Sequence, residues 1–444
     1  MKILLIQPKM NKRPMDTGLK TRMAPSLALL TLINITPAEH KVRLVNENVE
    51  KLDSDCAADL VGITVTLDVM PRAMAIAGEF RKRGVPVVAG GIHVTCRPED
   101  CLPHFDAICV GPAERVWARI ISDVEKKRLQ REYRDMEGFH GYEIASPDYR
   151  FAGGGKYLYT NVVTTSRGCP NRCAFCYNSC QNRLYITRPI PDVIKDIRSL
   201  GARHVLFIDD NFIGSPDYTR TLLNEIAPMK LIWSAAVTTR ILEYPDLLDQ
   251  MAISGCQSLF IGFESINTES LDSVHKDNNV AMYERLVEAI HSRSIMVNAS
   301  MVFGLDGDDK HTFKHTMDWL VKMRVETLTS HILTPYPGTE LYRRMEKVGR
   351  IHEYNLAKYN TAHVVFTPAK MTGEELYKGY RWIYKNFYSI KNIFKRFPKL
   401  KKQRVPYLLF NLFYRKYGRL TSAAAKIIPM RVLGRMAAWL SYRV

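Results

Sequence analysis

The stretch Ser166-Arg167-Gly168-Cys169-Pro170-Asn171-Arg172-Cys173-Ala174-Phe175-Cys176 places three cysteines in a C-x3-C-x2-C spacing, directly after the apolar run YTNVVTTS at residues 159–166. Such a run predicts a buried strand, so the three thiols belong to the loop that follows it. A [4Fe–4S] cluster ordinarily takes four cysteines, and three leave one iron open. An open iron can chelate the amino and carboxylate groups of a substrate, much as a catalytic metal keeps a free position.

The alternative for this loop is a structural zinc site or a closed iron–sulfur site. Cys180 follows Cys176 after three residues and is available as a fourth ligand. Structural zinc sites ordinarily pair two C-x2-C knuckles, and the second knuckle is missing here. We therefore expect the open cluster, with Cys180 taking no part.

Further strand-like runs continue beyond the cysteine loop. They are HVLFIDD (204–210), LIWSAAV (231–237), SLFIGFE (258–264), NASMVFG (298–304) and SHILTPYP (330–337). Helical patterns separate most of them. Together with YTNVVTTS they predict a partial (β/α)6, TIM-like barrel over residues 159–366. We expect this barrel to be open, because it has six strand–helix units where a closed TIM barrel has eight.

The first 130 residues show the same alternation with shorter runs. KILLIQ, VRLVN, LVGITV, PVVAGG and AICVG alternate with helical stretches at 25–35, 70–83 and 113–126. This rhythm predicts an α/β, doubly wound, Rossmann-like domain over residues 1–130. Residues 131–158 are polar and aperiodic, and we expect a linker there. Ligands of such sheets lie at the carboxyl ends of the strands, where small turn residues leave room.

With its cysteine loop, the barrel resembles the radical SAM superfamily, whose members place this spacing after the first strand of a partial barrel, with an aromatic residue such as Phe175 before the last cysteine. The resemblance implies that S-adenosylmethionine (SAM) binds the open iron of a cluster held by Cys169, Cys173 and Cys176, and that one electron splits it into methionine and a 5′-deoxyadenosyl radical. It also implies SAM contacts. These are Phe175, Asp209, Asp210, Arg240, Glu264, Ser265 and Gly304, with Glu264 and Ser265 at the ribose and Arg240 at the SAM carboxylate. The alternative for each beyond Phe175 is a capping or surface role.

The first domain in turn resembles the cobalamin-binding domain of cobalamin-dependent radical SAM enzymes, through residues 59–64, 87–93 and 110–114. The implied cobalamin contacts are Thr64, Thr66, Gly90, Gly91, His93, Gly111 and Glu114. The D-x-H-x-x-G signature that supplies a cobalt-ligating histidine is absent after the first strand, as in many members of this class. The alternative is a related domain that binds nothing.

The resemblance implies a methyltransferase that acts on an unactivated carbon of a lipid-like or natural-product substrate, with an electron donor such as flavodoxin or ferredoxin. Methylcobalamin would donate the methyl group, and a second SAM would restore it. Two alternatives stay open, because members with the same two domains also catalyse cyclisation or rearrangement, and radical SAM enzymes also modify tRNA or protein. The nature of the product decides between them.

Composition places the protein in the cytoplasm. No run reaches the eighteen or so apolar residues of a membrane-spanning helix, the start is too short and polar for a signal peptide, and nine cysteines without an export signal favour thiols or metal ligands.

The formal charge of +18 is concentrated at one end: residues 391–444 hold fourteen Lys and Arg and no Asp or Glu. Any electrostatic partner should therefore meet this tail.

The last region, residues 367–444, is predicted to be small and helical, with a helix at 373–388 and a basic, aromatic tail. Pro429 is suited to open an amphipathic helix. Its apolar face would carry Val432, Leu433, Met436, Trp439 and Leu440, with Arg431 and Arg435 on another face. This pattern favours peripheral contact with the inner membrane face over nucleic acid. The alternative is a tail that packs on the barrel with its charges solvated.

Overall fold

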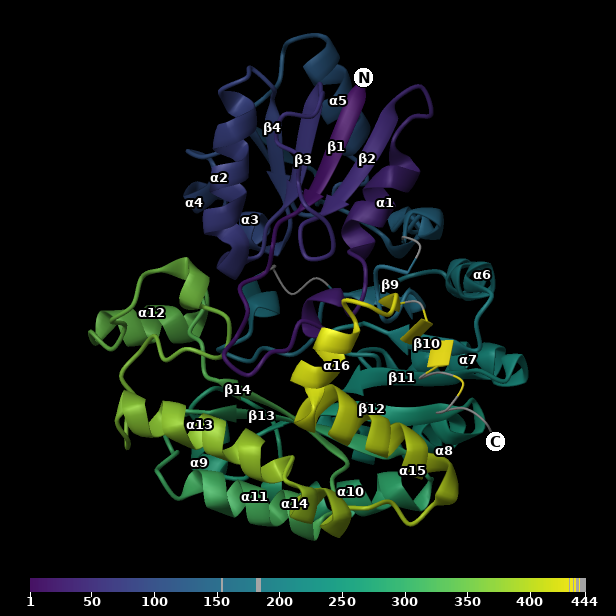
Figure 1. Cartoon of the computed structure of the whole chain (residues 1–444), viewed down its shortest axis with the longest axis vertical. Coiled ribbons are helices and arrows are strands. Elements are labelled where there is room, and N and C mark those ends of the chain that lie inside the picture. Colours follow the sequence, from purple (N-terminus) through teal and green to yellow (C-terminus); the bar gives the residue numbers. More distant parts are fainter. Residues whose placement is uncertain (153–154, 181–184, 431, 434, 437–438, 440–444) are drawn as a thin grey trace. The chain divides into compact units, whose positions relative to one another are not determined.

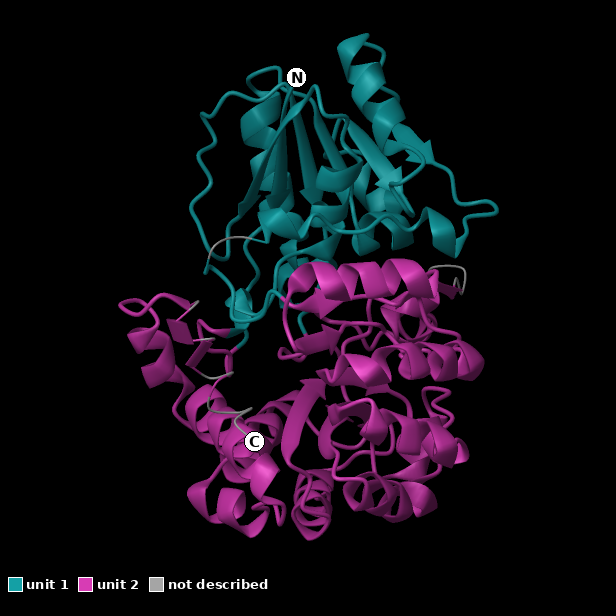
Figure 2. Ribbon diagram, turned by 90° about the vertical axis from the view of Figure 1, so that its right-hand side faces the viewer, with its two compact units in different colours: residues 1–13, 20–160, 354–360 teal, residues 14–19, 161–353, 361–444 magenta. Residues whose placement is uncertain are grey.

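The computed structural model describes residues 1–152, 155–180, 185–430, 432–433, 435–436 and 439. The chain divides into two units, and each has its own parallel sheet (Figures 1 and 2). Unit 1 comprises residues 1–13, 20–160 and 354–360. Unit 2 comprises residues 14–19, 161–353 and 361–444.

Unit 1 is built on a six-stranded parallel sheet in the order β2-β1-β3-β4-β5-β6. The strands are β1 (Lys2–Gln7), β2 (Lys41–Asn46), β3 (Leu60–Thr64), β4 (Val87–Gly90), β5 (Ala107–Val110) and β6 (Glu132–Arg134). Side chains of a strand alternate between the two faces of its sheet. In β1, Leu4 and Ile6 join one buried cluster, whereas Ile3 and Leu5 join another. The sheet therefore has a hydrophobic core on each face.

Helices cover both faces of this sheet. They are α1 (Leu27–Ile35), α2 (Met70–Arg81), α3 (Ile92–Cys96), α4 (Pro98–Cys101) and α5 (Trp117–Glu125). Phe80 of α2 belongs to the first cluster, and Trp117 of α5 belongs to the second together with Leu29 of α1. These helices bury the apolar faces that their sequence spacing predicts. The predicted doubly wound α/β fold is confirmed.

Residues 131–158, which we expected to form a linker, lie within unit 1. Three of them form β6 beside β5, and Tyr133 at its centre is fully buried. The Tyr133 hydroxyl donates to Asp123 Oδ2 over 2.9 Å. A three-residue strand with one apolar side chain is too short to show a period of two, so its sequence looks like a polar loop.

Unit 2 contains six parallel strands in chain order, β14-β13-β12-β11-β10-β7. They are β7 (Val162–Val163), β10 (His204–Phe207), β11 (Ile232–Val237), β12 (Cys256–Glu264), β13 (Met296–Phe303) and β14 (Thr327–Ile332). Each overlaps one of the six predicted runs, although β12 and β13 begin two residues before theirs and β14 begins three residues before its run. In the described part of the chain β7 and β14 do not pair with each other, so the barrel is open, as predicted.

The helices of unit 2 lie between its strands and after them. They are α6 (Ile190–Leu200), α7 (Pro216–Ile226), α8 (Pro245–Ile253), α9 (Thr268–Asp272), α10 (Tyr283–Ser292), α11 (Thr312–Lys322), α12 (Glu340–Lys347), α13 (Gly373–Phe387), α14 (Ile390–Lys395), α15 (Lys401–Leu408) and α16 (Gly418–Ala424). Phe263 of β12 packs edge-on against Tyr283 of α10 and Trp319 of α11, with ring centroids 4.8 and 5.3 Å apart. This outward face of the strands forms the barrel's buried layer.

Helix α13 closes the open edge of the barrel at β14. An edge strand exposes backbone N–H and C=O groups that need partners. The Tyr384 hydroxyl lies 3.1 Å from the Ser330 nitrogen and 3.3 Å from its oxygen, and the Tyr388 hydroxyl makes the same pair of hydrogen bonds to Leu328 at 3.0 and 2.7 Å. Two tyrosines one helical turn apart thus replace a missing strand.

The C-terminal residues up to Tyr417 are anchored on unit 2 by two arginines, of which Arg396 is buried and Arg415 is half-buried. Arg396 donates to the carbonyls of Val325, Glu326 and Phe387 over 2.8–2.9 Å. The Arg415 guanidinium lies 5.1–5.6 Å from the ring centroids of four aromatic residues, which are Tyr384, Tyr388, Phe410 and Tyr414. Such cation–π contacts are strongest when they exclude water. Arg396 and Arg415, two of the fourteen basic residues of the tail, therefore stabilise the packing of this region.

The helix predicted after Pro429 is described only in part. Val432, Leu433, Arg435, Met436 and Trp439 have helical backbone, while Arg431 and Leu440 lie outside the described residues. Over the part of the chain that the structure covers, no helix has the length and hydropathy needed to cross a membrane.

Candidate functional site

The cysteine loop begins at the carboxyl end of β7, after the short strand β8 (Ser166–Arg167), which pairs with β9 (Ile186–Thr187). Gly168 has φ of +82°, a value that glycine adopts without strain, and it turns the chain toward Cys169. The Cys176 N–H donates to the Cys173 carbonyl over 3.0 Å. Cys173 is buried, whereas Cys169 and Cys176 are half-buried.

The chemistry of this donor set fits an iron–sulfur cluster. All nine cysteines lie in the described chain, and none of them forms a disulfide there. Burial raises the pKa of the thiols of Cys169, Cys173 and Cys176. No group of three His, Cys, Asp or Glu side chains in the described residues converges as a single metal ion requires. A [4Fe–4S] cluster places its cysteines on different irons.

Asp209, a predicted SAM contact, holds the chain that leads into the loop. Its Oδ1 accepts from the backbone nitrogens and hydroxyls of Thr165 and Ser166, over 2.5–3.1 Å. The side chain is buried, and burial raises its pKa to about 6 although all four hydrogen bonds oppose the shift. Asp209 therefore fixes the backbone three residues before Cys169, and we propose this positioning role for it.

A buried salt bridge supports the same segment, and it was not predicted from the sequence. Arg188 Nη2 lies 2.8 Å from Asp196 Oδ2, and both side chains are almost fully buried. Arg188 also donates from Nη1 to the Thr164 carbonyl over 2.8 Å. This pair could not be predicted from the sequence, because a lone Arg beside a proline looks like a surface residue.

Glu264 ends β12, where the strand pairing shifts by one residue between Gly262 and Glu264. Its backbone has φ of +64°, which is uncommon for a residue with a side chain and concentrates at functional sites. The buried carboxylate lies 3.2 Å from Lys276 Nζ and accepts from Ser300 Oγ over 3.4 Å. Ser265, also buried, accepts from the Asn267 N–H. The predicted ribose site therefore contains a lysine that the sequence did not single out.

Gly304 ends β13 at a turn held by another buried carboxylate. Its φ is +97°, and a Cβ there would lie 2.7 Å from Leu376 Cδ2. Asp308 Oδ2 accepts from the backbone nitrogens of Gly304 and Leu305, and its Oδ1 accepts from Ser270 Oγ over 2.6 Å. Burial raises the pKa of Asp308 to about 6. Only glycine fits this backbone.

The remaining predicted SAM contacts are more open to solvent. Asp210 is exposed at the end of β10. Arg240, proposed for the SAM carboxylate, is about half exposed and forms an ion pair with Glu243 at 3.0 Å. Phe175 is half-buried within the cysteine loop. Cys180 ends a short 3-10 turn, Tyr177–Cys180, that follows the loop.

In unit 1, the predicted cobalamin contacts follow β3, β4 and β5, which are neighbours in the sheet. Gly91 has φ of +106°, and a Cβ there would lie 2.8 Å from the Val65 carbonyl oxygen. Thr64, Gly90 and Gly111 are half-buried at the strand ends, and Thr66 is exposed. Small residues and backbone groups therefore form this edge, which suits close approach by a flat macrocycle.

His93 and Glu114 behave differently from each other. The His93 side chain is fully buried in α3, and burial lowers its pKa to about 4, so it stays neutral near pH 7. Glu114 is half-buried beyond β5. The structure places His93 in the core of unit 1, and its contact with cobalamin stays a prediction.

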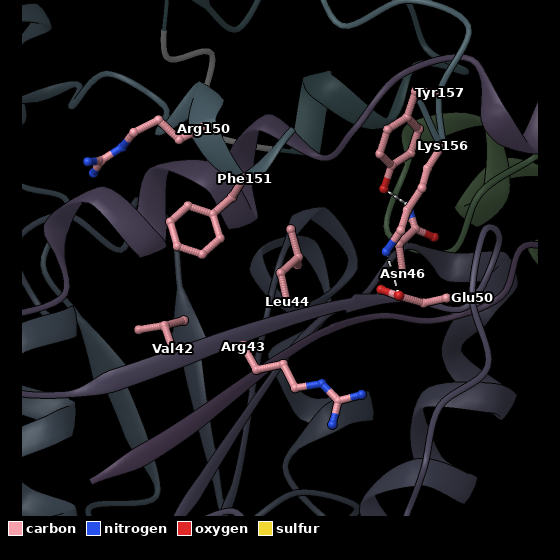
Figure 3. Close-up of a pocket in the computed structure, with 9 residues that line it drawn as sticks. All are labelled: Val42, Arg43, Leu44, Asn46, Glu50, Arg150, Phe151, Lys156 and Tyr157. Carbon is pink, nitrogen blue, oxygen red and sulfur yellow. Dashed lines mark hydrogen bonds and ion pairs between the residues drawn. The ribbon is translucent and has the colours of Figure 1, made fainter. Parts of the chain in front are cut away.

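A cavity of about 360 Å³ opens elsewhere in unit 1, beside the edge strand β2 (Figure 3). Its lining consists of Val42, Arg43, Leu44, Asn46, Glu50, Arg150, Phe151, Lys156 and Tyr157. Lys156 Nζ pairs with Glu50 Oε2 at 2.5 Å, and Asn46 Nδ2 donates to the Tyr157 hydroxyl over 2.9 Å. These groups satisfy one another, and the predicted cobalamin contacts follow other strands.

Comparison with known proteins agrees with this arrangement. Residues 163–320 match the radical SAM superfamily, residues 28–121 match the B12 binding domain, and residues 339–409 match a domain of unknown function. The chain is 28% identical over 410 residues to bacteriochlorophyllide d C-12(1)-methyltransferase from Chlorobaculum tepidum, covering 89% of each chain. It is 28% identical over 355 residues to hopanoid C-2 methylase from Rhodopseudomonas palustris, covering 74% of this chain and 66% of that one.

Solved structures match across nearly the whole chain. The radical SAM methyltransferase TsrM from Kitasatospora setae, solved with cobalamin and a [4Fe–4S] cluster, superposes with a TM-score of 0.65 at 15% identity, covering 96% of this chain and 99% of that one. At this identity the likeness establishes the fold. A B12-binding domain followed by an open barrel with a C-x3-C-x2-C loop defines an enzyme class that uses SAM, a [4Fe–4S] cluster and cobalamin. Both matched domains are those that cobalamin-dependent radical SAM enzymes combine, and the chain is similar to that family.

Proposed function

We propose that this enzyme transfers a methyl group to an unactivated carbon of a bulky, largely apolar small molecule. The observation that carries this proposal is the joining of the cysteine loop to a B12-binding unit in one chain. Relatives named as methyltransferases of bacteriochlorophyllide d and of hopanoids support it, since a tetrapyrrole and a polycyclic hydrocarbon are both large, apolar substrates.

The inward face of the barrel strands supports a bulky substrate. Residues that alternate with the buried outward layer are half-buried along this face, and few are large. They include Ser234, Ala236, Ser258, Phe260, Asn298 and Thr329. Ser234 Oγ lies 2.8 Å from Ser258 Oγ, and Thr329 Oγ1 donates to Asn298 Oδ1 over 3.3 Å. A ligand would therefore meet mostly short, uncharged side chains, of which the four polar ones are already hydrogen-bonded in pairs.

The chain's own residues would hold and orient the reactants. Cys169, Cys173 and Cys176 would hold the cluster, Asp209 would fix the approach to the loop, and Glu264 would meet the SAM ribose. When bound, the cluster and SAM supply hydrogen abstraction, and cobalamin supplies the methyl group. The glycine turns of Gly90, Gly91 and Gly111 would let the corrin approach the backbone.

The test is an anaerobic assay of protein reconstituted with iron, sulfide and hydroxocobalamin. The enzyme is incubated with dithionite, SAM carrying a CD3 group, and tetrapyrrole or polycyclic lipid substrates. We expect 5′-deoxyadenosine, S-adenosylhomocysteine and a product that carries CD3. Cys173→Ala should abolish all three, whereas Cys256→Ala, at a buried cysteine outside the loop, should leave them.

Other product classes would overturn methyl transfer. A substrate isomer or cyclised product with 5′-deoxyadenosine and no CD3 would indicate rearrangement. Labelled or altered tRNA or protein, with no small-molecule product, would indicate macromolecule modification. SAM cleavage by protein that retains no corrin would remove the role of cobalamin.

We further propose that the tail brings the enzyme to an anionic lipid surface, from which an apolar substrate would be collected. Residues 391–444 carry fourteen positive charges and no acid. Leu420 is 70% exposed and Ile427 is 87% exposed, which is unusual for aliphatic side chains beside so many cations. Each Lys or Arg near an anionic leaflet adds on the order of 1 kcal/mol, and the apolar side chains enter the interface.

Flotation with phosphatidylglycerol vesicles tests this second proposal. Leu420→Ser/Ile427→Ser should float less than the unaltered protein. The control is Ile253→Ser/Val348→Ser, because those side chains are 76% and 64% exposed but lie outside the tail. Equal flotation of all three proteins would contradict the proposal. Preferential binding of the protein to RNA would also contradict it, because the basic tail would then bind nucleic acid.

A further inference from the structure

Lys276 is a buried lysine in the barrel of unit 2 that neither the family resemblance nor the sequence pattern assigned. Only 9% of its side chain is exposed, and its Nζ lies 3.2 Å from Glu264 Oε1. A Cβ on Gly262 would lie 3.3 Å from the same nitrogen, so glycine leaves the ammonium room beside β12. Lysines are almost never buried unless they are paired.

The backbone carries this lysine past the cysteine loop. The Ala174 N–H, between Cys173 and Cys176, donates to the Val274 carbonyl over 3.0 Å. The chain turns at the next residue, His275, whose φ is +53°, and the Lys276 N–H closes the turn on the Leu271 carbonyl. The segment that bears Lys276 is thus hydrogen-bonded to the loop that bears the thiols.

The charge of Lys276 acts on all three cysteine thiols of the loop. Burial alone would favour the neutral amine, but Glu264 and Cys173 outweigh burial and raise the pKa of Lys276. The side chain therefore remains an ammonium at neutral pH. Lys276 forms its ion pair with Glu264, whose second oxygen accepts from the Ser300 hydroxyl.

We propose that the Lys276–Glu264 pair sets the reduction potential of the cluster held by Cys169, Cys173 and Cys176. The inference rests on the proposed function only in requiring a cluster on those cysteines. Reduction adds one electron from a low-potential donor, and with it one negative charge, to the oxidised cluster. A buried cation favours the reduced form, and a buried anion opposes it, because net charge near a cluster tunes its potential.

The two partners should act with opposite signs. Lys276→Met removes the cation and should make the cluster harder to reduce, changing the ratio of reduced to oxidised cluster at fixed potential by about tenfold or more, which is about 59 mV for one electron. Glu264→Gln removes the anion and should make the cluster easier to reduce by a similar factor. Lys276→Arg keeps the charge and should stay close to the unaltered protein.

The experiment is a redox titration of the reconstituted full-length protein without SAM, followed by electron paramagnetic resonance of the reduced cluster. Omitting SAM keeps any loss of SAM binding from entering the readout. Lys322→Met serves as a matched control, since Lys322 also pairs with a glutamate, Glu284, at 2.7 Å but is 66% exposed on α11. Its midpoint potential should not move.

Several outcomes would overturn this inference. One is an unchanged potential in Lys276→Met, and another is a shift of the same sign in Lys276→Met and Glu264→Gln, which a merely structural pair would give. If Lys276→Met fails to take up iron, an unchanged Glu264→Gln still overturns it. An unaltered protein without any [4Fe–4S] signal would instead contradict the proposed function.

Discussion

The substitution Asp209→Asn should change how the stability of the metal-free protein depends on pH. Asp209 is buried, and its pKa is raised from 3.8 to about 6 because desolvation outweighs four hydrogen bonds to Oδ1. A carboxyl whose folded pKa lies above its unfolded pKa binds its proton more tightly in the folded state. Its stabilising contribution is therefore complete below about pH 4 and is lost as the pH rises through 6.

The size of the effect follows from the two pKa values. The interval between 3.8 and about 6 corresponds to about 3 kcal/mol, since each pKa unit is about 1.4 kcal/mol. Asparagine keeps the shape and an accepting oxygen but does not titrate. The free energy of unfolding of the natural protein, minus that of Asp209→Asn, should thus fall by about 3 kcal/mol between pH 4 and pH 7.

Urea denaturation of the metal-free proteins at several pH values measures this difference. Asp246→Asn is the control with the opposite sign, because the hydrogen bond from Arg220 lowers the pKa of the exposed Asp246. Parallel stability curves for the natural protein and Asp209→Asn would refute the reasoning. A difference that grows with pH would show that the hydrogen bonds to Thr165 and Ser166 outweigh burial.

Three further substitutions test other parts of the structure. Cys180→Ser should keep the full iron and sulfide content after reconstitution, measured chemically, because the cluster needs only the three loop cysteines. Gly91→Ala should lower the free energy of unfolding of unit 1 by about 1–3 kcal/mol, measured by urea denaturation, and should reduce the corrin retained on gel filtration, since φ is +106° and Val65 leaves no room for a Cβ. Tyr384→Phe should cost unit 2 about 1–2 kcal/mol and speed amide hydrogen exchange at Ser330, whose N–H would lose its partner.

The positions of most strands along the chain could be predicted from sequence because each of these strands is buried on at least one face. KILLIQ and SLFIGFE are strongly apolar, and both become central strands. The short strand β6 was not predicted, because one buried tyrosine is too little to show the two-residue alternation of apolar and polar side chains. Residues 354–360 could not be assigned to unit 1 either, since only Leu356 joins its core and it comes from beyond the last barrel strand.

Some parts of the candidate site could likewise be predicted from the sequence, and others could not. The cysteine loop is visible in sequence because ligand spacing is local. The partners of Asp209 and Glu264 are not, because Thr165 and Lys276 reach them only once the chain has folded. The role of Arg240 stays a prediction: an arginine suits the SAM carboxylate by chemistry, and in the structure Arg240 forms an ion pair with Glu243, three residues away.

The central claim is that three cysteines hold a [4Fe–4S] cluster and leave one iron for SAM. Mössbauer spectroscopy of anaerobically reconstituted, ⁵⁷Fe-labelled protein tests it most directly. The claim predicts four irons per chain and a change confined to one of them when SAM is added. Zinc in place of iron, or four irons whose spectrum ignores SAM until Cys180 is replaced, would contradict it.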